Sequence, residues 1–144
     1  MSSGKIRVAI NGAGRIGRAF YKLAVERTEI EIVALNDLGD RENIEYLLKH
    51  DTVYGKWDGK TDFEFLQEKD PIRLPWHKLG IDVVVESTGL FTSYKSAQAH
   101  INAGAKRVVV TAPMKDDPAG GMEGGTVLMG VNEEKLAKCF ITSN

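Results

Sequence analysis

The sequence predicts an α/β protein with a Rossmann-type, doubly wound and mainly parallel sheet that carries helices on both faces. Short β-branched runs alternate with helical stretches, a pattern typical of βαβ units with right-handed crossovers. Two of the runs, 81–88 and 106–113, are almost continuously apolar, as expected of strands covered on both faces. A glycine-rich turn at 11–17 joins the first apolar run to the first helical stretch.

The predicted elements follow the chain in order. The first helix is indicated by apolar residues at helical spacing from Ile16 to Ala24, and a later helix has Ser93 as its N-cap and Gly104 as its stop. An Asp-Gly turn at 58–59 predicts an antiparallel pair of strands within 53–68, and the glycine-rich segment 115–126 is predicted to be a mobile loop. The remaining predictions are strands at 6–10, 30–37, 81–88, 106–113, 126–132 and 139–144, and helices at 14–27, 41–51, 93–104 and 133–138.

The composition is that of an ordinary globular protein, and it excludes several classes of function. The 144 residues fit one domain, predicted over 1–144, with 42% hydrophobic and 27% charged residues. A formal net charge of −1 gives no field that would favour nucleic acid or a membrane as a partner. A single cysteine excludes a disulfide framework and a multi-cysteine metal site. Without a long apolar run or a signal-peptide layout, the predicted location is cytoplasmic.

The glycine-rich turn has the spacing of a dinucleotide-binding loop. Gly12, Gly14 and Gly17 form a G-x-G-x-x-G pattern, which is a weak signal alone but a stronger one between a strand and a helix. Gly12 allows a tight turn, Gly14 lets a pyrophosphate approach the backbone, and Gly17 lets the helix pack close to the sheet. The helix N-terminus then offers free N–H groups and a partial positive charge to the phosphates.

Asp37 supplies the second part of this pattern. It ends the second predicted strand, 20 residues after Gly17, where a carboxylate accepts hydrogen bonds from an adenosine ribose. A carboxylate there repels a 2′-phosphate, so NAD is favoured over NADP. The alternative is a plain glycine turn followed by a solvated aspartate. The residues alone therefore indicate a dinucleotide-binding domain and specify no reaction.

Longer stretches of the sequence resemble the glyceraldehyde-3-phosphate dehydrogenase family. They are "VAINGAGRIGR", "ALNDL", "YLLKHDTVYGK", "FLQEKDPIRLPW", "IDVVVESTGLFT", "HINAGAKRVVVTAP", "MGVN" and "ITSN", in family order over almost the whole chain. The resemblance covers only the N-terminal, NAD-binding half of that family's enzymes. Erythrose-4-phosphate dehydrogenase is the main alternative, although "VTAP" and "ESTG" look more like the glyceraldehyde-3-phosphate enzyme.

The resemblance implies a set of cofactor-binding residues. These are Asn11, Gly12, Gly14 and Gly17 in the glycine-rich turn, Arg15 and Ile16 at the pyrophosphate, Asp37 at the ribose, Asn36 and Lys69 near the adenine, Ser87, Thr88 and Gly89 over the middle of NAD, Phe91 beside it, and Thr111 and Ala112 toward the nicotinamide. The ends of parallel strands, where "ESTG" and "VTAP" lie, are where ligands bind in open α/β sheets.

Several of these residues have alternative, structural roles. In these roles Lys69 is a solvated charge, Phe91 is a core residue or a hydrophobic staple at the helix entry, and Thr88 and Thr111 are partners of loop backbone groups. Arg15 favours the phosphate interpretation, because a cation at a helix N-terminus is unfavourable without an anion. Aromatic and imidazole side chains without ligand-like spacing are interpreted as structural or surface residues: Trp57, Trp76, His50, His77 and His100.

No catalytic residue is predicted. The family's nucleophile is the cysteine of S-N-A-S-C-T-T-N, which forms a thiohemiacetal and then an acyl-enzyme, whereas this sequence ends at Ser143-Asn144. Cys139 lies too early and has no evident basic partner, so a buried, inert thiol is expected. The chain is expected to bind NAD without catalysis. The full homotetrameric enzyme of glycolysis would use glyceraldehyde 3-phosphate and phosphate.

Three interpretations of the chain stay open, and the sequence departs from the family pattern at two segments. The chain is either an isolated domain or a piece of an intact enzyme, and a non-catalytic module that recruits a partner through the cleft is a third possibility. The segment 54–65 is shorter than the family's, and 115–126 is longer. Apolar patches are expected on the surface that the family's catalytic half covers.

Overall fold

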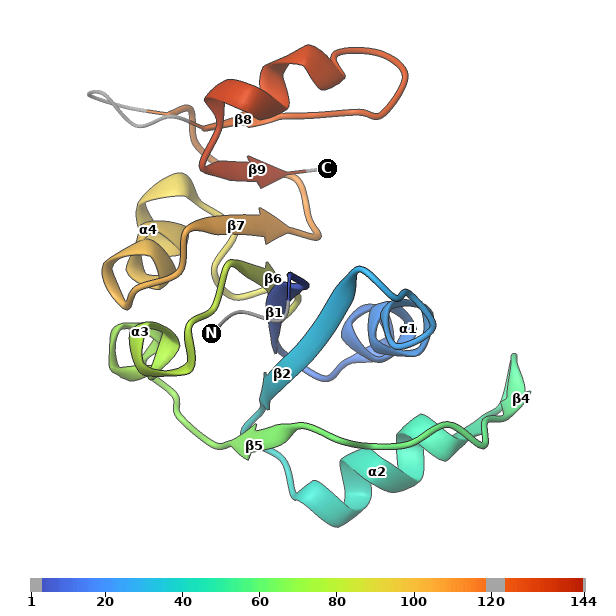
Figure 1. Ribbon diagram of the computed structural model, residues 1–144. Helices are drawn as coiled ribbons and strands as arrows, with labels where there is room; N and C mark the ends of the chain where they lie inside the picture. Colours follow the sequence, from blue (N-terminus) through green and yellow to red (C-terminus); the bar gives the residue numbers. More distant parts are fainter. Residues whose placement is uncertain (1–3, 119–123, 144) are drawn as a thin grey trace.

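The computed structural model describes residues 4–118 and 124–143, which contain one large parallel sheet (Figure 1). Seven strands lie in the order β5-β2-β1-β6-β7-β9-β8, and every neighbouring pair is parallel. Their bounds are β1 Ile6–Asn11, β2 Ile30–Asn36, β5 Glu64–Leu66, β6 Val83–Glu86, β7 Arg107–Val110, β8 Gly124–Thr126 and β9 Ile141–Ser143. The predicted fold class is confirmed.

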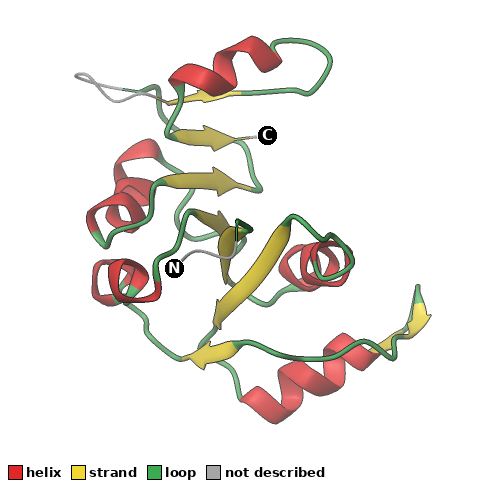
Figure 2. Cartoon of the chain, in the orientation of Figure 1, coloured by secondary structure: helices red, strands yellow, loops and turns green. Residues whose placement is uncertain are grey.

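Helices cover both faces of the sheet (Figure 2). Helices α1 (Arg15–Ala24) and α2 (Arg41–Lys49) lie on one side, and α3 (Trp76–Leu79) and α4 (Tyr94–Asn102) lie on the other. The chain also forms two 3-10 helices, η1 (Pro71–Arg73) and η2 (Glu133–Lys138). This is the doubly wound arrangement that βαβ units with right-handed crossovers produce.

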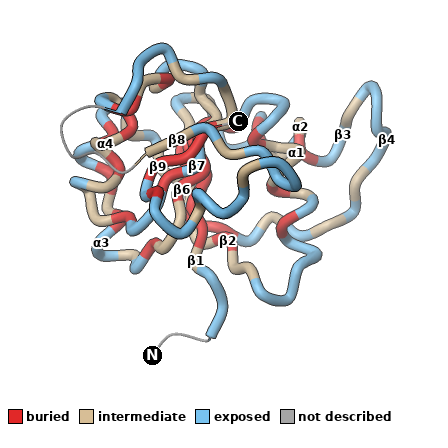
Figure 3. The backbone as a smooth tube through the Cα atoms, turned by 90° about the horizontal axis from the view of Figure 1, so that it is seen from above, coloured by how far each residue is buried: buried red, intermediate tan, exposed pale blue. Residues whose placement is uncertain are grey.

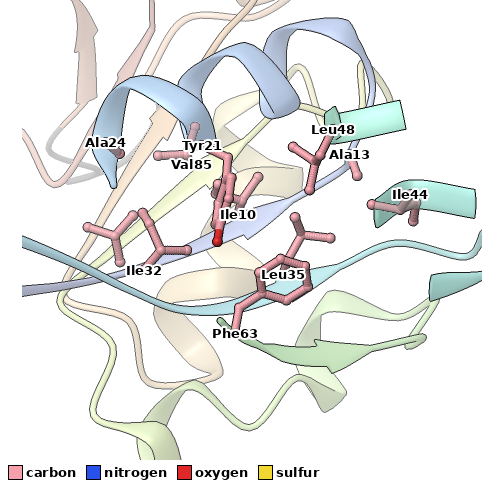
Figure 4. Close-up of a cluster of buried hydrophobic side chains, with 11 residues drawn as sticks. Ile10, Ala13, Tyr21, Ala24, Ile32, Leu35, Ile44, Leu48, Phe63 and Val85 are labelled. Carbon is pink, nitrogen blue, oxygen red and sulfur yellow. The ribbon is translucent and has the colours of Figure 1, made fainter. Parts of the chain in front are cut away.

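Alternate residues of the central strands point into two separate cores. Val8 and Ile10 of β1 belong to the first core, together with Tyr21 of α1 and Leu48 of α2. Figure 4 shows Ile10 with the other labelled side chains of this core. Ala9, between them, joins the second core on the α3 side. The central strands are accordingly the most buried part of the chain (Figure 3). A third cluster packs α4 against β7 and β9.

The prediction for residues 53–68 is wrong. The antiparallel pair is β3 (His50–Asp51) with β4 (Gly55–Lys56), and it protrudes from the molecule, whereas β5 pairs in parallel with β2. Asp51 Oδ1 fixes the hairpin turn by accepting from the backbone N–H groups of Val53 (2.7 Å) and Tyr54 (3.0 Å). These bonds, with that to Tyr54 the larger contribution, lower the pKa of Asp51. Gly59 instead lies against the Trp57 ring, which a Cβ there would overlap.

The C-terminal part also differs from the predicted elements. The strand expected at 126–132 is wrong, because β8 ends at Thr126. The chain turns after it, and Asn132 Oδ1 closes the turn by accepting from Leu128 N at 2.7 Å. Cys139 ends η2 and precedes β9, rather than opening a strand, and it is buried as expected. The centre of the predicted loop at 115–126 lies outside the described residues, and its last residues form β8.

The predicted helices are mostly right in position. The one expected at 14–27 ends at Ala24, and the one expected at 41–51 ends at Lys49 because His50 enters β3. Ser93 forms a reciprocal capping box with Ser96, so the expected N-cap of α4 is confirmed. The short helix α3 was not predicted, since its four residues are too few to show a period.

Asp82, the residue before β6, links β1 to the residue before β7 through its side chain. Its Oδ2 accepts from the backbone N–H of Arg7 at 2.9 Å, and its Oδ1 lies 2.8 Å from Lys106 Nζ. The hydrogen bond from Lys106, and then that from Arg7, lower the pKa of Asp82 below its usual value. The carboxylate therefore stabilises the folded state in its charged form.

Replacing Asp82 by asparagine should lower the free energy of unfolding by about 0.5–1 kcal/mol at pH 7, because the partly exposed pair with Lys106 is lost. Since the folded-state pKa is lowered, this difference is fully present above the ordinary pKa of about 3.9 and disappears as the pH falls through the folded-state value. Urea unfolding of both proteins at pH 7 and at pH 3 measures it. Equal stabilities at pH 7 would contradict the assignment.

Candidate nucleotide-binding cleft

A cleft of about 880 Å³ opens at the carboxyl ends of β1, β2 and β6. It lies at the switch point of the sheet, because the chain runs from β1 outward to β2 and β5 and then returns to β6 on the other side of β1. Ligands of open α/β sheets bind at such a point. The predicted site residues that line the cleft are Asn11, Gly12, Gly14, Asn36, Asp37, Lys69, Ser87, Thr88 and Phe91.

Close backbone contacts explain two of the three glycines of the turn. Gly12 has a φ of +99°, and a Cβ there would lie 2.7 Å from the backbone nitrogen of Thr88. A Cβ on Gly17 would overlap the carbonyl oxygen of Gly12, at the start of α1. Gly14 differs, since no atom lies within 4 Å of its Cβ position. The turn is therefore tightly packed below and open toward the cleft.

The N-terminus of α1 faces this opening without a protein cap. Gly14 is the N-cap residue, and among the described residues no side chain accepts from the N–H groups of the first turn, which also has no acidic residue. Uncapped N–H groups and the helix dipole favour an anion at this position. The structure therefore fits a phosphate group on the glycine-rich turn.

Asp37 is bound to the same turn. Its Oδ2 accepts from the backbone N–H of Ala13 at 2.8 Å, and its Oδ1 accepts from Gly39 N at 2.7 Å. Arg18 Nη1 donates to the carbonyl oxygen of Ala13 at 2.7 Å, so both sides of the turn are held. Sequence reasoning missed this role of Arg18, because a helical arginine one turn after the loop looks like a solvated charge.

The other predicted residues do not line the cleft: Arg15, Ile16, Gly17, Gly89, Thr111 and Ala112. The Arg15 guanidinium lies 3.7 Å from Asp51 Oδ1 of the hairpin. Thr111 donates through its backbone N–H (3.1 Å) and its Oγ1 (3.3 Å) to the carbonyl oxygen of Glu86. This is the structural role considered for Thr111. The contacts of these six residues with a cofactor remain predictions.

One wall of the cleft was missed. The additional lining residues are Leu38, Glu68, Asp70, Pro71, Arg73 and Leu90. Most of them follow β5, which pairs in parallel with β2 and so ends at the same edge of the sheet. Assigning 53–68 to an antiparallel pair hid this consequence. A parallel β5 would have placed 68–73 beside Asp37.

Ser87 contributes an unpaired hydroxyl to the opposite wall. Its backbone N–H donates to Asn11 O at 2.7 Å, whereas its buried Oγ has no hydrogen-bond partner among the described residues. A buried polar atom without a partner is costly, and a ligand group can relieve it. This wall therefore also fits a polar ligand.

Comparison with known proteins identifies the family. Residues 6–94, more than half of the chain, match the family model described as glyceraldehyde 3-phosphate dehydrogenase, NAD binding domain. The chain belongs to this family. Curated glyceraldehyde-3-phosphate dehydrogenases are similar over nearly the whole chain. The protein of Streptomyces coelicolor is 44% identical over 90% of this chain, and glyceraldehyde-3-phosphate dehydrogenase A of Escherichia coli is 41% identical over 96%.

These relatives of the NAD-binding domain are much longer than the chain. It spans only 41% of the Streptomyces protein and 44% of the Escherichia protein. A relative from Trypanosoma brucei brucei, named as cytosolic, is 42% identical over 96% of this chain. Within residues 4–118 and 124–143, no helix has the length and apolar character needed to span a membrane.

One packed and one open glycine position of the family's turn make a matched test. Gly17→Ala should lower the free energy of unfolding by about 1–3 kcal/mol, because the new methyl group overlaps the Gly12 carbonyl and displaces α1. Gly14→Ala, with open space around its Cβ, is the control and should stay within about 0.5 kcal/mol of the parent protein. Urea denaturation measures both. Equal losses in the two variants would show that the close contact at Gly17 is not a constraint.

Proposed function

We propose that residues 1–144 form one NAD-binding unit that holds the dinucleotide in the cleft at the switch point. The observation that carries the proposal is the glycine-rich turn at the uncapped N-terminus of α1, where Gly14 leaves open space. The next residue back, Ala13, ties this turn to Asp37 by donating its backbone N–H to the carboxylate. The pyrophosphate would lie on the turn and the adenosine ribose beside Asp37. Membership of an NAD-binding domain family supports this assignment.

The charges of the cleft support the choice of NAD over NADP. Asp37 presents a carboxylate where the ribose hydroxyls are expected, and its charge would repel a 2′-phosphate. The wall that follows β5 adds two carboxylates, Glu68 and Asp70, and two cations, Lys69 and Arg73. Together with Asp37, the cleft lining carries three carboxylates and two cations.

We further propose that the unit serves a phosphorylating aldehyde dehydrogenase that acts on glyceraldehyde 3-phosphate, as the names of its relatives suggest. Bound NAD supplies the hydride acceptor of that reaction. The described residues would bind and orient it, whereas catalytic and phosphate-binding groups are not assigned to them. A cytoplasmic, homotetrameric enzyme is the matching proposal for the whole protein. Erythrose-4-phosphate oxidation is the alternative activity.

Replacing Asp37 by alanine should weaken NAD binding about tenfold, since a carboxylate that accepts from ribose hydroxyls and from the glycine-rich turn is lost. Isothermal titration calorimetry with NAD and NADP measures this loss. Asp37→Asn separates the two effects: it keeps an acceptor but removes the charge, so it should bind NADP better than the parent protein does. Equal affinity of the parent protein for NAD and NADP would disprove the role of Asp37.

A protein of these 144 residues, with its 15.8 kDa mass verified by mass spectrometry, should bind NAD yet produce no NADH from glyceraldehyde 3-phosphate and phosphate. The physical reason is that Cys139, the only thiol, is 8% exposed and lies at the end of η2. Absorbance at the NADH band measures turnover. Turnover by the 144-residue protein would contradict the prediction, and loss of that turnover in Cys139→Ser would assign the reaction to Cys139. Binding of a protein or nucleic acid that NAD displaces would favour a recruiting module.

A further inference from the structure

A chain of buried hydrogen bonds runs beneath the cleft from the α3 side of the sheet. It begins at Trp76, whose Nε1 donates to His100 Nδ1 at 3.0 Å, and His100 Nε2 lies 2.6 Å from Glu86 Oε2. The three side chains are at most 2% exposed. We propose that Glu86 is a positioning residue for the cofactor cleft, and that His100, held in one tautomer by Trp76, keeps it in place. The inference rests on the proposed binding of NAD.

The partners of His100 determine its tautomer. An indole N–H can only donate, so Nδ1 of His100 must be the unprotonated acceptor. The ring is then neutral with its hydrogen on Nε2, which donates to the Glu86 carboxylate. The Trp76 indole thus prevents His100 from presenting an acceptor to Glu86. The pair is a fixed donor and a fixed acceptor.

The Glu86 carboxylate joins both sides of the cleft. Oε2 also accepts from Asn11 Nδ2 at 2.7 Å, at the end of β1. Oε1 accepts from the backbone N–H of Thr88 at 3.0 Å and from Thr88 Oγ1, which in turn accepts from Leu90 N at 3.0 Å. Four donors converge on this one group, and only an ionised carboxylate can accept from all of them. The loop that lines the cleft therefore depends on Glu86 for its conformation.

The same network reaches the opposite wall. Asn36 Nδ2 donates to Asn11 Oδ1 at 2.7 Å and to Glu68 O at 2.9 Å, and Glu68 N donates to Asn36 Oδ1 at 2.9 Å. In this network the side-chain amides of Asn11 and Asn36 each have a nitrogen that donates and an oxygen that accepts, so the neighbouring groups fix their orientation. A change at His100 is consequently transmitted to the cleft through hydrogen bonds, because no member can reverse its role alone.

The test compares two replacements of His100 by calorimetric titration with NAD, each with its thermal unfolding midpoint measured without NAD. His100→Gln keeps an acceptor for Trp76 and a donor for Glu86, and should bind NAD within about threefold of the parent protein. His100→Leu fills similar space without either group, and should bind NAD about tenfold more weakly because Glu86 loses a donor. Tyr21→Phe is the control for general destabilisation and should leave NAD affinity unchanged, because its hydroxyl forms two part-buried hydrogen bonds elsewhere, donating to Lys60 O and accepting from Asp62 N.

The outcomes separate the two proposals. No NAD binding by the parent protein would refute the proposed function, whereas parent-like affinity of His100→Leu, or equal weakening in both His100 variants, would refute the positioning role alone. Should His100→Leu not fold, nitrogen NMR of the parent protein decides. An unprotonated Nδ1 with a protonated Nε2 supports the fixed tautomer, and a protonated Nδ1 overturns it.

Discussion

The common register of three parallel strands is the constraint on which the rest of the structure depends. Asn11 of β1 is paired with Asn36 of β2 on one side and with Glu86 of β6 on the other. Because parallel strands run in one direction, these three polar residues end at one edge and can bond to one another. The glycine-rich turn, Asp37 and the Thr88 loop then start from a single platform, so the cleft geometry is a consequence of strand register.

The sequence predicted the parts of the cleft that depend on local chemistry. Gly12 and Asp37 in the lining, and Gly17 at the start of α1, could be identified because each position needs a particular residue type at a fixed distance from a strand end. The wall at 68–73 could not, because its position depends on whether β5 pairs in parallel, and a short strand carries little periodic signal. Trp76, His100 and Glu86 were also missed as a unit. They are separated along the chain, and only the fold brings their side chains together.

Asp37 orders the glycine-rich turn and is also the residue proposed to contact the ribose. In the structure its carboxylate already accepts from Ala13 and Gly39, so the turn is ordered by the group proposed to contact the ribose. A site formed in this way needs little reorganisation when a ligand arrives, which favours affinity. Because one carboxylate holds the turn and is the proposed ribose contact, a substitution at Asp37 changes both together. This is why the charge and the hydrogen bond have to be separated by different replacements.

Strand β7 has the apolar sequence of a strand covered on both faces, but the described elements cover only one of its faces. Val108 and Val110 are buried under α4, but Val109, which points to the other face, is 38% exposed. A strand with valine on both faces is typical of a sheet covered on both sides. Helices α1 and α2 provide the second layer over β1, β2 and β6, and among the described elements none provides it over β7. The apolar patch expected where the family's catalytic half packs stays a prediction.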